Sequence, residues 1–288
     1  EAVPALLDGV AVAVVRLLGG RPAWPDGLAA VLASGVPTVV LSGEPAPDAE
    51  LMAASTVPVG VATQALAYLV EGGPENLAQL ARFLSDTVLL TGEGFAPPAS
   101  TPAYGVYGDR TARADRPTIG IVFYRAHALA GNTAFVDTLA DAVEAAGGNP
   151  LPVYCGSLRG LAADAGPMAL LSRCDALLVT VLAAGGAVAA DASAGGDEDA
   201  WDVGALASLD VPVVQALCLT STREQWAGSD AGLTPLDAAM QVAVPEFDGR
   251  VITVPFSFKR IDGDGLSVYR ADPERAARVA GIAVRQAR

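Results

Sequence analysis

One short stretch of the sequence gathers residues that could bind a ligand. Residues 124–135 read YRAHALAGNTAF, and they contain Arg125 and the only histidine of the 288-residue chain, His127. An arginine can hold a carboxylate or a phosphate through two parallel hydrogen bonds. A histidine can ligate a metal, transfer protons near neutral pH or act as a structural hydrogen-bond donor. The stretch is therefore the first candidate for a functional loop.

The end of the same stretch has the pattern of a helix start. Asn132 and Thr133 follow Gly131 and precede an amphipathic segment. A strand, a short loop and a helix in this order place backbone N–H groups and the positive end of the helix dipole at the loop, which favours binding of an anion. The simpler alternative is that Asn132 or Thr133 only caps the helix. The sequence is compatible with both interpretations.

A metal site would need more ligands than His127 supplies. The chain has no second histidine, so carboxylates would have to complete the site, and Asp191 and Glu246 are the candidates in loops. A structural or exposed histidine is the alternative. Glu246 and Asp248, two positions apart before a predicted strand, could form an acid–base pair, although turn formation is the more common use of such residues.

Common catalytic and nucleotide-binding motifs are absent from the sequence. No G-x-G-x-x-G follows a strand, and neither G-x-x-x-x-G-K-[ST] nor G-x-S-x-G occurs. The net charge of −14 and the pI near 4.4 argue against binding to nucleic acids or to anionic membrane surfaces. We expect no cofactor bound by this chain and no nucleic-acid partner.

The cysteine and hydropathy patterns indicate a cytoplasmic protein. Cys155, Cys174 and Cys218 form no C-x-x-C pair and lie in or beside apolar runs, so we expect reduced, buried thiols. The longest uncharged apolar run, 176–190, is broken by two glycines and is shorter than the about 18 residues of a membrane span. The start of the sequence lacks the ordered basic, apolar and cleavage regions of a signal peptide.

Residues 1–95 alternate apolar runs with helical patterns. Strands are predicted at 10–18 and 37–43, because continuous apolar runs are typical of strands buried on both faces of a parallel sheet. Two strands are few for such a sheet, so we expect a partial Rossmann-like α/β domain that is incomplete at its N-terminal side. Its helices are predicted at 25–33, 63–70 and 75–90.

Residues 96–117 are rich in glycine and proline, and no periodic pattern continues through them. We therefore predict a linker there. Residues 118–288 are predicted to form a flavodoxin-like α/β domain with about five parallel strands and a hairpin near the end. The predicted strands are 118–124, 149–155, 175–183, 211–219 and 250–258, and the predicted helices are 133–146, 164–172 and a last one that starts at Asp272-Pro273.

Ligands of open α/β sheets bind beyond the carboxyl ends of the strands. In the second predicted domain this rule selects the loops 125–132, 156–159, 185–202 and 220–235. No metal ligand and no catalytic residue is assigned from these loops. The candidate substrate-binding residues are Arg125, His127, Asn132, Thr133 and Glu246.

Four longer phrases resemble a known family. They are RLLGGRPAW (16–24), FLSDTVLLTGEGF (83–95), YRAHALAGNTAFVDTL (124–139) and TPLDAAMQVAVPEFDGR (234–250). Together they closely resemble the large, CobN-type subunit of aerobic cobaltochelatase, which is related to the H-type large subunit of magnesium chelatase. The likeness runs through both predicted domains and covers essentially the whole chain.

The resemblance implies a specific activity. The large subunit of this family binds the tetrapyrrole hydrogenobyrinic acid a,c-diamide and Co²⁺ as substrates, and two AAA+-type subunits use ATP with Mg²⁺ to drive cobalt insertion on the route to vitamin B12. The H-G-x-x-E stretch associated with the family's centre is missing, since His127 is followed by Ala128. The chain therefore resembles an N-terminal piece that we expect to be inactive alone.

Three alternatives stay open at the level of sequence. Within the family, the intact protein could insert magnesium or another metal into a porphyrin. Outside it, the chain could be a non-catalytic, two-lobed binder of a small anion. It could also be a docking module that touches only partner subunits.

Overall fold

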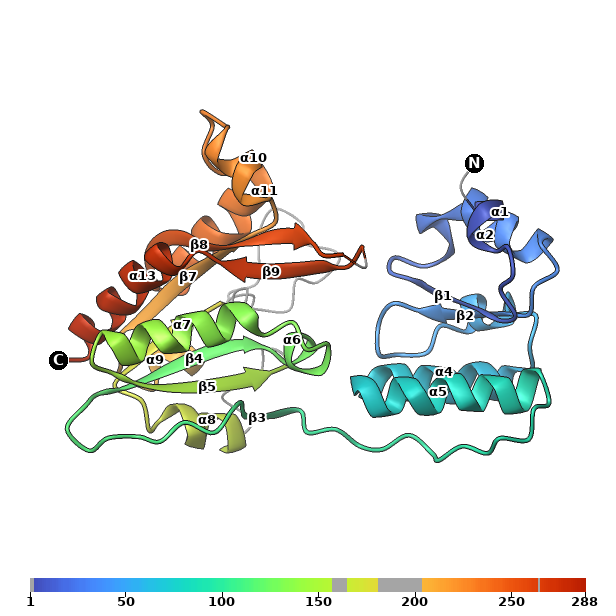
Figure 1. The fold of residues 1–288 in the computed structure, drawn as a ribbon, viewed down its shortest axis with the longest axis horizontal. Coiled ribbons are helices and arrows are strands. Elements are labelled where there is room, and N and C mark those ends of the chain that lie inside the picture. Colours follow the sequence, from blue (N-terminus) through green and yellow to red (C-terminus); the bar gives the residue numbers. More distant parts are fainter. Residues whose placement is uncertain (1–2, 157–164, 181–203, 264) are drawn as a thin grey trace. The chain divides into compact units, whose positions relative to one another are not determined.

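The computed structural model describes residues 3–156, 165–180, 204–263 and 265–288 (Figure 1). The chain divides into two compact units, Glu1–Thr101 and Pro102–Arg288. The predicted loop 185–202, with the candidate ligand Asp191, lies outside the described residues.

The first unit is built on a two-stranded parallel sheet of β1 (Ala13–Leu17) and β2 (Thr38–Ser42). Its helices are α1 (Val3–Leu6), the short η1 (Arg21–Ala23), α2 (Pro25–Ala33), α3 (Ala49–Ala53), α4 (Val59–Glu71) and α5 (Gly73–Val88). Every residue of β2 is buried. Val39 clusters with residues of α4 and α5, whereas Val40 clusters with α2 and α3. Successive side chains of the strand thus enter two cores, as its two-residue period requires.

The second unit contains a seven-stranded, mostly parallel sheet. Its strands are β3 (Tyr104–Val106), β4 (Thr118–Tyr124), β5 (Asn149–Cys155), β6 (Ala176–Val179), β7 (Val213–Leu219), β8 (Val251–Ile261) and β9 (Ser267–Ala271). They lie in the order β3-β5-β4-β6-β7-β8-β9, with antiparallel pairing only for β3 and β9 at the edges. The five parallel strands therefore have the flavodoxin-like order 2-1-3-4-5. The predicted α/β fold is confirmed.

Helices cover both faces of this sheet. They are α6 (Arg125–Leu129), α7 (Ala134–Ala145), α8 (Ala165–Leu171), α9 (Gly204–Ala207), α10 (Arg223–Ala227), α11 (Pro235–Ala238), the π-helix η4 (Ala239–Ala243), α12 (Val244–Phe247) and α13 (Pro273–Gln286). Ile121 and Phe123 of β4 pack with α7 and α13, whereas Val122 packs with Leu171 of α8 on the other face. A strand buried on both sides explains the uninterrupted apolar run.

Three segments that were predicted to be irregular contain secondary structure. The predicted loops 125–132 and 220–235 include the helices α6 and α10, and the predicted linker 96–117 includes the strand β3, which pairs with β5. All three elements are five residues long or shorter. Such short elements display no hydrophobic period, so only their tertiary contacts reveal them.

A helical segment from 235 to 247 has no counterpart among the predicted elements. The helices α11, η4 and α12 follow one another without a break, and the wide π turn of η4 has a local cause. Pro245 has no N–H group, and in a regular helix its ring would collide with the carbonyl oxygen of Gln241, four residues earlier. The turn that precedes the proline therefore widens.

The predicted buried thiols are confirmed. Cys155, Cys174 and Cys218 are free and buried. Cys155 and Cys174 belong to the core beneath α8, and Cys218 belongs to the core beneath α7 and α13. Among the described helices, none is long and apolar enough to cross a membrane.

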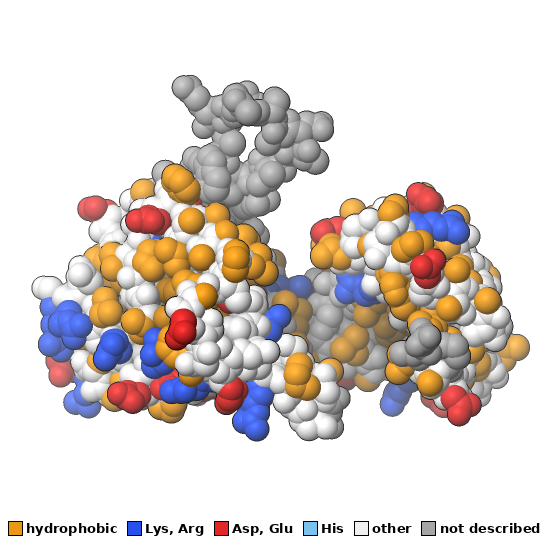
Figure 2. Space-filling view, turned by 90° about the horizontal axis from the view of Figure 1, so that it is seen from above, with side chains coloured by type: hydrophobic (Ala, Val, Ile, Leu, Met, Phe, Trp, Pro, Cys, Tyr) orange, Lys and Arg blue, Asp and Glu red, His pale blue; other side chains and the backbone are white. Residues whose placement is uncertain are grey.

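Charges of both signs share the surface of the second unit. On the face drawn in Figure 2, its Lys and Arg side chains lie among carboxylates. Arg110 is an example, since it pairs with Asp141 at 2.9 Å and with Glu144 at 2.8 Å, both on α7. These exposed ion pairs contribute little to stability.

Gly120 of β4 is a position where no side chain fits. An added Cβ atom would lie 2.6 Å from Leu177 Cδ2 and 2.9 Å from Cys174 Sγ. We expect Gly120→Ala to lower the free energy of unfolding by about 1–3 kcal/mol, the usual cost of overpacking a core. Urea denaturation measures this loss. The control is Gly156→Ala, where an added Cβ has no neighbour within 4 Å among the described residues. Equal losses in both variants would contradict the packing argument.

Candidate functional site

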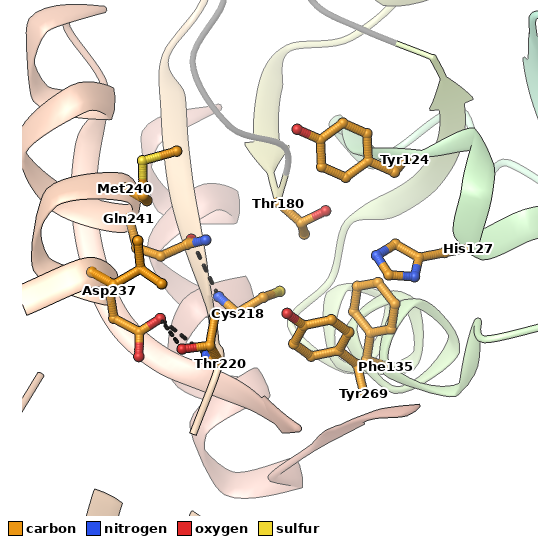
Figure 3. A pocket seen from close by; sticks show the side chains of 11 residues that line it. Tyr124, His127, Phe135, Thr180, Cys218, Thr220, Asp237, Met240, Gln241 and Tyr269 are labelled. Atoms are coloured by element: carbon orange, nitrogen blue, oxygen red, sulfur yellow. Dashed lines mark hydrogen bonds between the residues drawn. The ribbon is translucent and has the colours of Figure 1, made fainter. Parts of the chain in front are cut away.

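A cavity of about 240 Å³ opens at the carboxyl ends of β4, β6 and β7 (Figure 3). The chain order reverses between β4 and β6, and such switch points are the usual ligand sites of open α/β sheets. The lining is mostly apolar, with a few polar groups that could orient a ligand. The described lining residues are Tyr124, His127, Phe135, Thr180, Cys218, Thr220, Leu236, Asp237, Met240, Gln241 and Tyr269.

Among the predicted site residues, His127 is in the described lining. It lies on α6, directly after β4, and its ring meets Phe135 and Tyr269 edge to face at centroid distances of 5.2 and 5.5 Å. These aromatic contacts orient the imidazole. Figure 3 shows it across the cavity from Asp237 and Gln241.

Three neighbouring candidates have structural partners instead. Arg125 Nε donates to the carbonyl oxygen of Pro102 at 2.9 Å. Asn132 Oδ1 accepts a hydrogen bond of 3.0 Å from the backbone nitrogen of Tyr269, and this bond ties the loop before α7 to β9. The Thr133 hydroxyl accepts from Tyr107 Oη at 2.9 Å, and Thr133 occupies the N-cap position of α7 without a side-chain capping bond.

Glu246 lies away from the cavity. It is exposed on α12, which precedes the amino end of β8, and the cavity lies at the carboxyl ends of the parallel strands. Asp191 is outside the described residues. Within the described ranges, no three His, Cys, Asp or Glu side chains are grouped as metal ligands would be. The structure therefore does not bring Glu246 together with His127.

Asp237 is a functional candidate that the sequence-based set omits. Thr220, directly after β7, donates from its backbone nitrogen and its hydroxyl to Asp237 Oδ1, both at 3.0 Å. The other oxygen, Oδ2, is shielded from solvent and has no hydrogen-bond partner among the described residues, a rare and costly arrangement. The sequence signal is Thr-Pro-Leu-Asp at 234–237, a helix-start motif in which the Thr234 hydroxyl accepts from Asp237 N.

A series of hydrogen-bonded, buried polar side chains extends from the amino end of β8 to the cavity. Asp248 Oδ2 pairs with Arg250 Nη2 at 2.6 Å, and the two side chains are 1% and 0% exposed. Arg250 Nη1 donates to Gln215 Oε1 at 2.7 Å. Gln215 Nε2 then donates to Gln241 Oε1 at 3.2 Å, and Gln241 lines the cavity. These hydrogen bonds connect a buried ion pair to the candidate site.

Burial favours the uncharged forms of three titratable groups in the lining, those of His127, Cys218 and Tyr269. Burial, and secondly the positive charge of Lys259, lowers the pKa of His127. Burial raises the pKa of Cys218, and burial, with a smaller contribution from the nearby Asp237 carboxyl group, raises the pKa of Tyr269. The imidazole, the thiol and the phenol are therefore neutral at pH 7. The described lining contains no lysine or arginine. It therefore offers no positively charged side chain to an anion, which is the kind of ligand that the sequence pattern of the loop 125–132 favours.

Removal of one partner should reveal the cost of the buried ion pair. We expect Arg250→Met to lower the free energy of unfolding by about 3–5 kcal/mol, because it leaves the Asp248 carboxylate buried without its cation. Urea denaturation provides the measurement. The matched control is Arg113→Met, which breaks a surface pair with Asp115 whose side chains are 63% and 74% exposed, and which should cost less than about 1 kcal/mol. Similar losses in the two variants would contradict the role of burial.

The single histidine allows a direct test of its surroundings. The pKa of His127 in the folded protein lies below the ordinary value of 6.5, so the unfolded chain binds the proton more readily. The free energy of unfolding should therefore fall as the pH drops from about 6.5 to the folded-state pKa, and this contribution should end below that pKa. An NMR titration of the ring protons measures the midpoint, and His127→Gln should abolish this pH dependence. A midpoint at or above 6.5 would show that the ring is not buried as described.

Known proteins resemble this chain along most of its length. The sequence profile of the family described as CobN/Magnesium Chelatase matches residues 66–288. The aerobic cobaltochelatase subunit CobN of Pseudomonas aeruginosa is 34% identical, over 96% of this chain and 23% of that protein. The H-type magnesium-chelatase subunit of Rhodobacter capsulatus is 30% identical, over 72% of this chain and 19% of that protein.

A solved structure of a cobaltochelatase subunit is also similar to this chain. The catalytic subunit of cobaltochelatase from Mycobacterium tuberculosis matches with a TM-score of 0.77 and 56% identity, over 99% of this chain and 24% of that one. The chain thus spans about a quarter of the length of these cobaltochelatase relatives. The resemblance that the four phrases indicate is confirmed by the profile match over most of the chain. The chain belongs to the CobN/magnesium chelatase family.

Proposed function

We propose that this chain is the N-terminal part of the tetrapyrrole-binding subunit of an ATP-dependent cobaltochelatase. The complete enzyme inserts Co²⁺ into hydrogenobyrinic acid a,c-diamide in aerobic cobalamin biosynthesis. The observation that carries the proposal is the 56% identity to the cobaltochelatase subunit of M. tuberculosis over 99% of the chain. Identity to the R. capsulatus magnesium-chelatase subunit is 30% over 72% of the chain, which supports cobalt as the inserted metal.

Cobalt insertion makes chemical demands that several parts of such an enzyme would share. The pyrrolic protons must leave the macrocycle, and the hydrated metal ion must lose water, so a base and metal ligands are needed. We assign these two tasks to the remainder of the complete subunit. We assign ATP hydrolysis with Mg²⁺ to two AAA+-type partner subunits.

The cavity of the second unit would contribute part of the tetrapyrrole contact. Its volume of about 240 Å³ is smaller than the roughly 300–1,000 Å³ of pockets for drug-sized ligands, so it accommodates a substituent of the macrocycle but not the ring. His127 contacts that substituent in this proposal, and Arg125, Asn132 and Thr133 hold the loop in place. Glu246, exposed on α12, would serve a separate surface.

A porphyrin-binding subunit of a magnesium chelatase is the second candidate. The observation in its favour is the sequence match to the H-type magnesium-chelatase subunit of R. capsulatus. The two candidates share the fold and differ in the macrocycle and the metal. Binding of the macrocycle therefore distinguishes them.

Absorbance titration with hydrogenobyrinic acid a,c-diamide tests the proposal. We expect saturable binding by the 288-residue chain and, after His127→Gln, at least tenfold weaker binding, or about 1.4 kcal/mol, because the imidazole lies in the cavity wall. Arg113→Met changes an exposed side chain outside the described lining and should bind as the wild type does.

Two outcomes would change the proposal. Tighter binding of protoporphyrin IX than of the diamide would favour the magnesium chelatase. No binding of either macrocycle would contradict a tetrapyrrole contact within this chain.

A further inference from the structure

The amide group of Gln241 has one defined orientation in the cavity wall. Its oxygen, Oε1, accepts hydrogen bonds from Gln215 Nε2 at 3.2 Å and from the backbone nitrogen of Cys218 at 3.4 Å. A carboxamide has its oxygen and its NH₂ group on opposite sides. Figure 3 shows the nitrogen of Gln241 pointing toward the middle of the ring of lining residues. Gln241 therefore presents a hydrogen-bond donor to the cavity.

The hydrogen bonds of Arg250 and Gln215 prevent the opposite orientation of the Gln241 amide group. A guanidinium group has only donors, so the Gln215 oxygen must face Arg250 Nη1, which lies 2.7 Å away. The NH₂ group of Gln215 must then face Gln241, and the backbone nitrogen of Cys218 is a second donor on the same side. A flipped Gln241 amide would place its NH₂ group against two donors. The ion pair of Arg250 with Asp248 thus determines which group lines the cavity.

Acceptors lie elsewhere in the same cavity. The Thr180 hydroxyl donates its hydrogen to the carbonyl oxygen of Val122 at 2.9 Å, so lone pairs of this oxygen stay available as acceptors. The neutral imidazole of His127 also has one ring nitrogen that accepts. Figure 3 shows Thr180 between Gln241 and His127.

The electrostatic character of the lining argues for a neutral ligand group. No lysine or arginine is among the described lining residues, and the imidazole is uncharged. The Asp237 carboxyl group lies in the same wall and disfavours a second carboxylate. The described lining therefore favours a neutral group that accepts from Gln241 and donates to the acceptors opposite.

We infer that the cavity is a subsite for a primary carboxamide, whose carbonyl oxygen accepts from Gln241 and whose N–H group donates to Thr180. The inference rests on the proposed function for the molecule that carries this group, a tetrapyrrole with amidated side chains. Gln241 then distinguishes an amidated side chain from a free carboxylate. Arg250, Gln215 and Asp248 act as positioning residues, since they orient Gln241 without reaching the ligand.

The substitution Gln241→Glu tests this assignment. Glutamate keeps one oxygen for the bonds from Gln215 and Cys218, and it replaces the donor that faces the cavity with a second oxygen. In absorbance titrations, the wild type should bind hydrogenobyrinic acid a,c-diamide at least tenfold more tightly than hydrogenobyrinic acid, and Gln241→Glu should lose at least tenfold in affinity for the diamide. The control is Gln286→Glu, the same change at an exposed position of α13, and it should leave both affinities unchanged. Equal affinity of the wild type and Gln241→Glu for the diamide would overturn the inference.

A second probe separates this inference from the proposed function. The ring protons of His127, the only histidine of the chain, report on the cavity by NMR. Propionamide should shift these resonances saturably in the wild type and propionate should not, whether or not the chain binds a tetrapyrrole. Failure of the diamide to bind, together with a response to propionamide, would reject the proposed ligand and keep the carboxamide subsite. Equal responses to propionamide and propionate would reject the subsite.

Discussion

The buried ion pair between Asp248 and Arg250 is the interaction on which the arrangement of the site depends. Both side chains are withdrawn from water at the amino end of β8, and Arg250 Nη1 donates to Gln215 Oε1 on β7. Buried pairs of this kind add little net stability, but they strongly disfavour conformations in which one partner is unpaired. Their effect here is directional, because each donor fixes the orientation of the next polar group between Arg250 and the cavity.

The arrangement of the site also depends on the path of the backbone between β7 and β8. A regular helix would place the side chains after α11 at a constant angular step, but Pro245 interrupts the hydrogen bonds of the preceding turn. The wide turn of η4 results, and it carries Met240 and Gln241 to the cavity. π turns are frequent at functional sites, and this one has an identifiable cause in the sequence. The ion pair and the proline thus determine together where one amide group lies.

The sheet and one site residue are predictable from the sequence, whereas the polar network is not. Strands buried on both faces produce long apolar runs, and the position of His127 directly after such a run places it at the ligand-binding edge of the sheet. Arg250 and Gln241 share no local sequence pattern, because they are linked only through Gln215 on β7. Arg125 Nε and the Thr133 hydroxyl have hydrogen-bond partners that are distant in sequence, Pro102 and Tyr107, and no local pattern indicates these contacts.

The hydrogen bond between Asn132 and the backbone of Tyr269 joins residues 137 positions apart. Tyr269 lies on β9, the edge strand that is synthesised after all the other strands of its sheet, and it also lines the cavity. Contacts between such distant segments form only after a large loss of chain entropy. The wall that Tyr269 contributes to the cavity therefore exists only once β9 has joined the sheet. A ligand that binds there would act on the finished unit and would stabilise it against unfolding by mass action.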